Sequence, residues 1–353
     1  MTGPPLSIVP LTGMPEVQSG DDLVALLLEA VASAHLALVD GDVVVVSSKV
    51  VSKSLGLWAD SSLKGAAVAS QTVRVVAERM AGDRVTQIVR STAGPTMAAA
   101  GVDASNTGGR DAVLLLPADP DAEAEHLRVR LLTRTGLHRL GVVVSDTAGR
   151  PWRFGQTDFA LGAAGVEVVD DLRGGVDADG QALSVTARAV GDELASAADL
   201  VKGKTDAIPA AVVRGTQWAA DHRGPGARAL LRTGREDWFD YGRAEAIRAA
   251  LGLEPGSSAT DSIGIASVAP EPARTRLHRA VAVACANLPF GGGADTTTDG
   301  VVELSADTAY QVGVLAARLA VALWGEGLGS QLDGADFVGP DGEARARVVV
   351  TGR

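Results

Sequence analysis

Short polar runs follow several apolar stretches of the sequence, and these runs carry the side chains that could do chemistry. Residues 47–53 (SSKVVSK) come directly after the apolar run 43–46, and Asp146 and Thr147 follow the apolar run 140–144. Hydroxyl and ammonium groups at the end of a strand can hold phosphate oxygens. An aspartate beside a hydroxyl suits magnesium or manganese, because these ions take carboxylate, hydroxyl and phosphate oxygens as ligands.

Simpler interpretations stay open for two of the polar runs. Residues 47–53 could continue an exposed strand with solvated lysines. The stretch GVDASNTGG (101–109) places the oxygen-bearing side chains of Asp103 and Asn106 in a glycine-flanked turn. Taken alone, it is an ordinary turn stabilised by an Asx side chain.

The segment after residue 144 favours a site more strongly, because five polar or charged residues follow an apolar strand without a helix-capping pattern. Arg150 and Arg153 could each bind a carboxylate or a phosphate through two hydrogen bonds. We expect Arg150 to be a catalytic candidate beside Asp146. Trp152 could be a stacking surface, or it could pack in the core or under a lid.

The run KGKT (202–205) ends like a Walker A phosphate-binding loop, but the rest of that pattern is missing. The required glycine five residues before the Gly-Lys pair is replaced by Ala198, and a predicted helix precedes the run in place of a strand. The lysines could equally complement the dipole of that helix. The five histidines show no metal-binding spacing, and there is no GxSxG elbow or strand-linked GxGxxG pattern.

The charge and length of the chain exclude several classes of protein. It has 353 residues, 43 of them acidic and 32 basic, and a net charge of −11. This argues against a general nucleic-acid or anionic-membrane binder. One cysteine, Cys285, excludes a disulfide framework and an iron–sulfur cluster. Without a signal peptide or a long apolar run, we expect a cytoplasmic protein with no membrane partner.

The periodicity and the turn residues predict short strands and helices that mix without a regular βαβ repeat, so we expect an α+β fold. A basic, glycine-rich stretch predicts two domains, residues 1–225 and 235–353, the second smaller and mostly helical. In that second domain a loose segment, 289–300, is expected between two helices, 242–251 and 308–324. In the first domain, strands are expected at 6–11, 43–46, 113–116, 140–144, 159–169 and 210–213, and helices at 23–34, 72–80, 119–134 and 187–201.

The polar runs, in their order along the chain, resemble one family, the coenzyme F420-0:γ-glutamyl ligases. The resemblance covers residues 6–217. The matching stretches are LTGMPEVQSGDDL (11–23), DGDVVVVSSKVVSKSLG (40–56), AGVDASNTGG (100–109), LLLPADPDAEAEHLR (114–128), GVVVSDTAGRPWRFGQTDFALGAAGV (141–166), DDLRGGVDADGQALSVTARAVGDELASAADLVKGK (170–204) and IPAAVVRG (208–215).

The resemblance implies a GTP-dependent ligase that attaches L-glutamate to the lactyl-phosphate tail of the deazaflavin coenzyme F420-0. It implies two magnesium or manganese ions, an acyl phosphate, release of GDP and phosphate, and a homodimer. It also implies site residues. The nucleotide would contact Gly13, Met14, Pro15, Glu16, Ser48, Lys49, Lys53, Asn106, Gly203 and Lys204. The metals would be held by Asp103, Asp146 and Thr147. Some members carry an acidic metal ligand where Lys204 stands here.

Other functions are compatible with the same residues. A glutamyl ligase could act on another cofactor acceptor, because acceptor rings are distinguished by the shape of the pocket. A non-catalytic nucleotide- or cofactor-binding protein is disfavoured by the retained Asp103 and Asp146. Residues 309–333 faintly resemble a helix of flavin-binding nitroreductase domains. About 120 residues are few for such a domain, and its arginine-rich opening motif is missing, so we do not expect a bound flavin.

Overall fold

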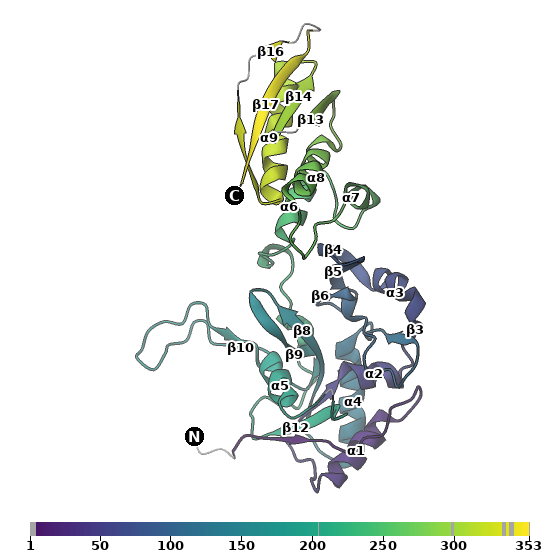
Figure 1. Cartoon of the computed structure of the whole chain (residues 1–353). Helices are drawn as coiled ribbons and strands as arrows, with labels where there is room; N and C mark the ends of the chain where they lie inside the picture. The colour runs from purple at the N-terminus through teal and green to yellow at the C-terminus, as the bar shows by residue number, and fades with distance from the viewer. Residues whose placement is uncertain (1–4, 204, 298–299, 334–336, 339–341, 353) are drawn as a thin grey trace. The chain divides into compact units, whose positions relative to one another are not determined.

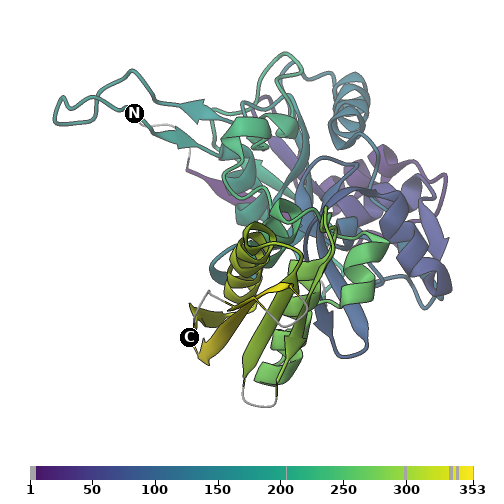
Figure 2. The same cartoon turned by 90° about the horizontal axis from the view of Figure 1, so that it is seen from above.

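The computed structural model describes residues 5–203, 205–297, 300–333, 337–338 and 342–352. The chain divides into two compact units, which are drawn in Figures 1 and 2. The first unit combines residues 1–73 with Arg90–Glu236, and the second combines Arg74–Val89 with residues 237–353. A single stretch of sequence therefore does not correspond to either unit. Lys204, which we expected at the nucleotide, lies outside the described residues.

The first unit is built around one central sheet, whose described strands follow the order β1-β12-β2-β8-β9. Strands β2 and β8 run parallel, and the other neighbours are antiparallel. The strands of this unit are β1 (Ser7–Pro10), β2 (Val43–Ser47), β3 (Trp58–Asp60), β6 (Thr96–Ala98), β7 (Ala112–Leu114), β8 (Gly141–Arg150), β9 (Arg153–Ala164), β10 (Asp170–Asp171), β11 (Ala187–Arg188) and β12 (Ala210–Arg214).

Helices cover both faces of this sheet. The helices of the first unit are α1 (Leu23–Ser33), α2 (Ser48–Ser54), α3 (Lys64–Ser70), α4 (Pro120–Thr135) and α5 (Val190–Asp199). Alternate valines of β2 face opposite ways. Val44 and Val46 pack in a core with α1 and α4, whereas Val43 and Val45 pack in a second core with α5. Burial on both faces explains why β2 and β8 read as continuous apolar runs.

Sequence signals at the ends of helices are confirmed in the first unit. Asp22 caps α1 by accepting a hydrogen bond from the Ala25 backbone amide, and Asp119 caps α4 in the same way. Gly136 ends α4 in the left-handed conformation, with a φ of 73°. Helix α5 begins later than expected, because Ala187–Arg188 pairs with β10 as strand β11.

The helix expected at 72–80 is wrong, because these residues form a strand, β4 (Thr72–Ala81), followed by β5 (Arg84–Ser91). Val76 and Glu78 are buried and their neighbours are more exposed, which is the period of two that a strand shows. Threonine and valine in this segment also favour a strand, since branching at Cβ restricts their side chains in a helix. The second unit includes most of this strand.

The α+β class is confirmed, but the description of the second unit as mostly helical missed a sheet. The helices are α6 (Arg243–Ala250), α7 (Ser258–Ile263), α8 (Ala273–Cys285) and α9 (Ala309–Gly325). The strands of its antiparallel sheet are β13 (Gly292–Thr296), β14 (Val301–Ala306), β15 (Leu328–Leu332), β16 (Phe337–Val338) and β17 (Ala344–Gly352). The segment expected to be loose, 289–300, thus contains β13. Cys285 ends α8 and is only partly buried.

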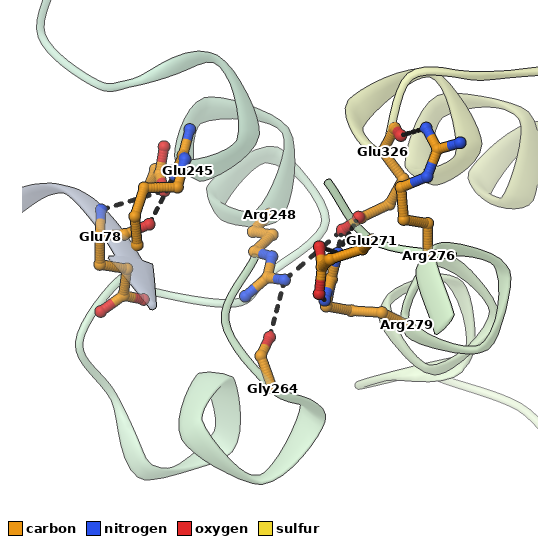
Figure 3. Close-up of polar contacts among 9 residues, drawn as sticks. Glu78, Glu245, Arg248, Gly264, Glu271, Arg276, Arg279 and Glu326 are labelled. Atoms are coloured by element: carbon orange, nitrogen blue, oxygen red, sulfur yellow. Dashed lines mark hydrogen bonds and ion pairs between the residues drawn. The ribbon is translucent and has the colours of Figure 1, made fainter. Parts of the chain in front are cut away.

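A network of buried charges lies among the helices of the second unit (Figure 3). Arg279 donates hydrogen bonds to both Glu271 and Glu326, and Arg248 contacts Glu326 and donates to the Gly264 carbonyl. The side chains of Arg248, Arg279 and Glu326 are each only 6% exposed. Burial lowers the pKa of Arg248, whereas the hydrogen bonds to its two glutamates outweigh burial and raise the pKa of Arg279.

No helix among the described residues is long and apolar enough to cross a membrane.

Candidate active site

The topology of the central sheet brings the polar runs to one edge. Ser47 at the end of β2 lies opposite Ser145 on the parallel strand β8. Strand β12 runs antiparallel to β2, with Ala210 opposite Val46, so the loop before β12 reaches the same edge. The segment that follows β1 begins at the same edge, since Pro10 at the end of β1 pairs with Ala211. Residues as far apart in the sequence as Met14 and Pro209 therefore meet around one space.

That space is a cavity of about 330 Å³ in the first unit. Its wall contains most of the site residues that we expected: Met14, Pro15, Glu16, Lys49, Lys53, Asn106, Asp146, Thr147 and Gly203. Gly13 directly precedes Met14 of this wall. Its φ of 77° would be strained for a residue that carries a side chain. Ser48 and Asp103 are not in this wall, but Ser48 contacts Asp146 and Asp103 contacts Lys49.

Two lysines place positive charge in the cavity. The Lys53 side chain is 5% exposed, and its Nζ lies 2.5 Å from Oε1 of Glu16. The Nζ of Lys49 lies 2.6 Å from the Asp103 carboxylate. Burial raises the pKa of Asp103, but hydrogen bonds from Lys49 and from the Ser105 backbone outweigh it and hold that pKa below its usual value. The ammonium groups of both lysines belong to residues of the cavity wall, where an incoming anion could contact them.

Asp146 is the carboxylate whose surroundings are least favourable to its charge. Burial raises its pKa to about 6, and the nearby Asp158 carboxylate adds to the rise. A hydrogen bond from the Thr147 backbone, a second from Ser48 Oγ, 3.1 Å from Oδ1, and the charge of Lys49 only partly offset this. Within the part of the chain that the structure describes, no lysine or arginine pairs with Asp146. A bound cation would supply the missing positive charge.

Two further residues line the cavity, Asp158, which sequence patterns did not single out, and Lys202, the first lysine of the KGKT run. Lys202 Nζ lies 2.6 Å from Asp158 Oδ2, and both side chains are almost completely buried. Asp158 also accepts hydrogen bonds from the Ser145 and Thr147 hydroxyls, at 2.8 and 2.7 Å. Burial raises the pKa of Asp158, but the charge and hydrogen bonds of Lys202 outweigh it, so its pKa stays low. The pair fixes the orientation of Thr147.

A divalent cation fits the oxygen donors in this wall and next to it. Asp146 offers a carboxylate, Thr147 a hydroxyl, and Asp103 a second carboxylate close to Lys49. Among the described residues, no group of three or more His, Cys, Asp or Glu side chains is placed to hold a metal. Magnesium commonly takes only one or two protein carboxylates and completes its shell with water and substrate phosphates. The donors present thus suit a cation that arrives with a phosphorylated ligand.

Arg150 is not part of the cavity wall. It lies exposed at the far end of β8, opposite Arg153 in the β8–β9 hairpin. The expectation that Arg150 acts beside Asp146 therefore has no support from the geometry of the cavity.

The sequence model of the F420-0:Gamma-glutamyl ligase family matches residues 13–215. The chain belongs to this family. The matched residues include every element that contributes to the cavity wall, and they account for more than half of the chain.

Curated proteins named coenzyme F420:L-glutamate ligase match well over half of the chain. The coenzyme F420:L-glutamate ligase of Haloarcula marismortui is 38% identical over 253 residues, which cover 66% of this chain and 95% of that protein. The ligases of the same name from Natronomonas pharaonis and Archaeoglobus fulgidus are 39% and 37% identical, and the matches cover 91% and 90% of their lengths. These three matches cover 66%, 64% and 61% of this chain, so between 34% and 39% of it lies outside them.

Proposed function

We propose that this family member adds L-glutamate to the lactyl-phosphate tail of coenzyme F420-0, using GTP and releasing GDP and phosphate. The observation that carries the proposal is the convergence of Lys49, Lys53, Asp146 and Thr147 on one cavity, within the segment that matches the ligase family. The family and the names of its curated members support the acceptor and the amino acid. The buried lysines and oxygen donors support a nucleotide bound with a cation.

The reaction would pass through an acyl phosphate. The γ-phosphoryl group moves to the terminal carboxylate of the acceptor, and the glutamate amine then attacks the acyl carbon and releases phosphate. Phosphoryl transfer depends mainly on positioning and on neutralisation of charge, and it needs no protein nucleophile. In this cavity Lys53 and Lys49 would neutralise the nucleotide phosphates, and Asp158 with Lys202 would hold Thr147 in place.

Magnesium or manganese, held by Asp146, Thr147 and Asp103, would neutralise charge that develops on the phosphate oxygens. The net charge of the protein is −11, and both large substrates are anions. The positive charge of the cavity must therefore come from a few placed lysines and from the metal.

The decisive experiment incubates the full chain with GTP, manganese, L-glutamate and F420-0. We expect mass spectrometry to find the acceptor with one or more glutamyl additions, together with an equivalent amount of GDP. Adding hydroxylamine in place of glutamate should trap the acyl phosphate as a hydroxamate. Replacing F420-0 with a carboxylated pterin tests the other acceptor class. GDP formation with the pterin but not with F420-0 would refute the proposed acceptor.

We expect the substitution Lys53→Met to weaken nucleotide binding. Lys53 is buried in the cavity wall, and its partner Glu16 is about half exposed, so a phosphate can take its place beside the ammonium group. A hydrogen bond to a charged group contributes about 1.5–3 kcal/mol, which corresponds to a rise in KM for GTP of roughly 10- to 100-fold. Lys64→Met, at an exposed lysine outside the cavity, is the matched control. Equal KM values for GTP in the two variants would contradict the role of Lys53.

A further inference from the structure

The β8–β9 hairpin ends in two aromatic side chains that are strongly exposed. Trp152 is 80% exposed and Phe154 is 106% exposed. The flanking residues Arg150 and Arg153 are opposite each other in the hairpin, and both are exposed. We call these four residues the aromatic tip. Aromatic residues make up only 3% of the sequence, so two of them within one turn is a local concentration. Exposed apolar patches of this kind mark binding surfaces.

The backbone of the turn points to a requirement for the tryptophan ring. Trp152 follows Pro151 and has a φ of 58°, in the left-handed region. After a proline, a turn residue with positive φ is normally glycine or asparagine, because a bulky side chain is strained there. Strain of this kind is concentrated at functional sites. Stability of the hairpin alone would favour glycine at this position.

The aromatic tip is continuous with the cavity through the two strands of the hairpin. Thr147 on β8 and Asp158 on β9 both line the cavity, and both strands run on from there to the tip. The three residues from Thr147 to Arg150 span about 10 Å at ~3.3 Å per residue. A ligand whose reacting group lies beside Thr147 could therefore reach the tip if it were extended.

We propose that the aromatic tip binds the ring end of the acceptor, which is a flat aromatic molecule with an anionic phosphodiester. This inference rests on the proposed function. Trp152 and Phe154 offer faces on which an aromatic ring can stack. Arg150 and Arg153 offer guanidinium groups that match a phosphodiester. The terminal carboxylate would then lie toward Thr147, and the tip would select acceptors by their ring and phosphate.

The test compares the double variant Trp152→Ala/Phe154→Ala with the wild-type full chain under saturating GTP and glutamate. We expect the KM for F420-0 to rise at least about tenfold. The kcat and the KM for GTP should change little, because both side chains lie outside the cavity wall. The single variant Trp152→Phe should retain most of the affinity. Trp238→Ala is the matched control, since Trp238 is 78% exposed and lies in the second unit.

A binding measurement separates this inference from the proposed reaction. Fluorescence polarisation of the deazaflavin alcohol, which has the ring but no phosphate tail, should show binding to the wild type and a loss in the double variant. If the wild type ligates glutamate but the double variant keeps its KM for F420-0, the inference is overturned and the function stands. If the wild type is a dimer and the double variant is a monomer, the aromatic tip is instead a contact between two copies of the chain, and the inference is overturned. Absence of ligation by the wild type would refute the proposed function, and the polarisation result would still decide the inference.

Discussion

The substitution Asp146→Asn should abolish glutamate addition while the protein remains folded. Asp146 is a partly buried carboxylate of the cavity wall, and among the described residues no lysine or arginine forms an ion pair with it. An amide of the same shape cannot supply the charge that holds a divalent cation. Stabilisation of a developing phosphate charge by a metal contributes several kcal/mol. At about 1.4 kcal/mol per tenfold, that corresponds to a loss of roughly 10³-fold in kcat.

Two measurements distinguish this role from a structural one. Burial disfavours the charge of Asp146, so a neutral amide there should not lower the melting temperature of the metal-free protein. Manganese with GTP should raise the melting temperature of the wild type but not that of Asp146→Asn. Asp83→Asn, at a side chain that is 97% exposed, serves as the control. An Asp146→Asn variant that still ligates glutamate at more than a tenth of the wild-type rate would rule out the metal role.

The second large effect is expected on stability, from Glu326→Gln in the second unit. Glu326 Oε1 and Oε2 accept hydrogen bonds from Arg279 at 2.9 and 2.5 Å, and Oε1 lies 3.7 Å from Arg248. Both arginines are almost fully buried (Figure 3). Removing the carboxylate charge therefore leaves their positive charges without enough negative charge nearby. Breaking a buried ion pair by removing one partner costs about 3–5 kcal/mol. We expect a loss of this size in the free energy of unfolding.

Chemical denaturation followed by circular dichroism measures that loss. The matched control is Glu303→Gln, because Glu303 lies 3.8 Å from Arg347 in a pair whose side chains are about half exposed. A surface pair contributes about 0–1 kcal/mol, so the control should unfold almost as the wild type does. If both variants lose the same small amount, the buried network does not stabilise the second unit.

Much of the first unit could be predicted from local signals in the sequence. Four such signals act through neighbours that are close in sequence. They are the capping aspartates Asp22 and Asp119, Gly136 at the end of α4, and the apolar run of β2. The helix predicted for residues 72–80 was wrong, because contacts distant in sequence decide the structure of this segment. In the structure Glu78 is buried, and its backbone amide donates to Glu245, which lies far along the chain. Nothing near residue 78 indicates that contact.

The candidate site also contains some residues that local sequence signals predict and others that they do not. Lys53, Asp146 and Thr147 could be predicted because each follows an apolar strand in a recognisable motif, and the sheet then brings them together. The pairing of Asp158 with Lys202 joins residues that are 44 positions apart, so no spacing rule reveals it. Asp158 did carry one signal, since it is an acidic residue directly before the apolar run 159–169. Arg150 lies outside the cavity wall because an extended strand carries the chain away from Asp146.

The division of the second unit between two segments has a consequence for synthesis and truncation. Strand β4 is translated early, and the 147 residues from Arg90 to Glu236 must follow before the rest of its unit exists. Until then Met80 and Val76 lack the backbone partners that residues 266–268 and Gly242 provide. A gene shortened after codon 236 would thus produce a protein that still carries a fragment of the missing unit, with a strand exposed for aggregation.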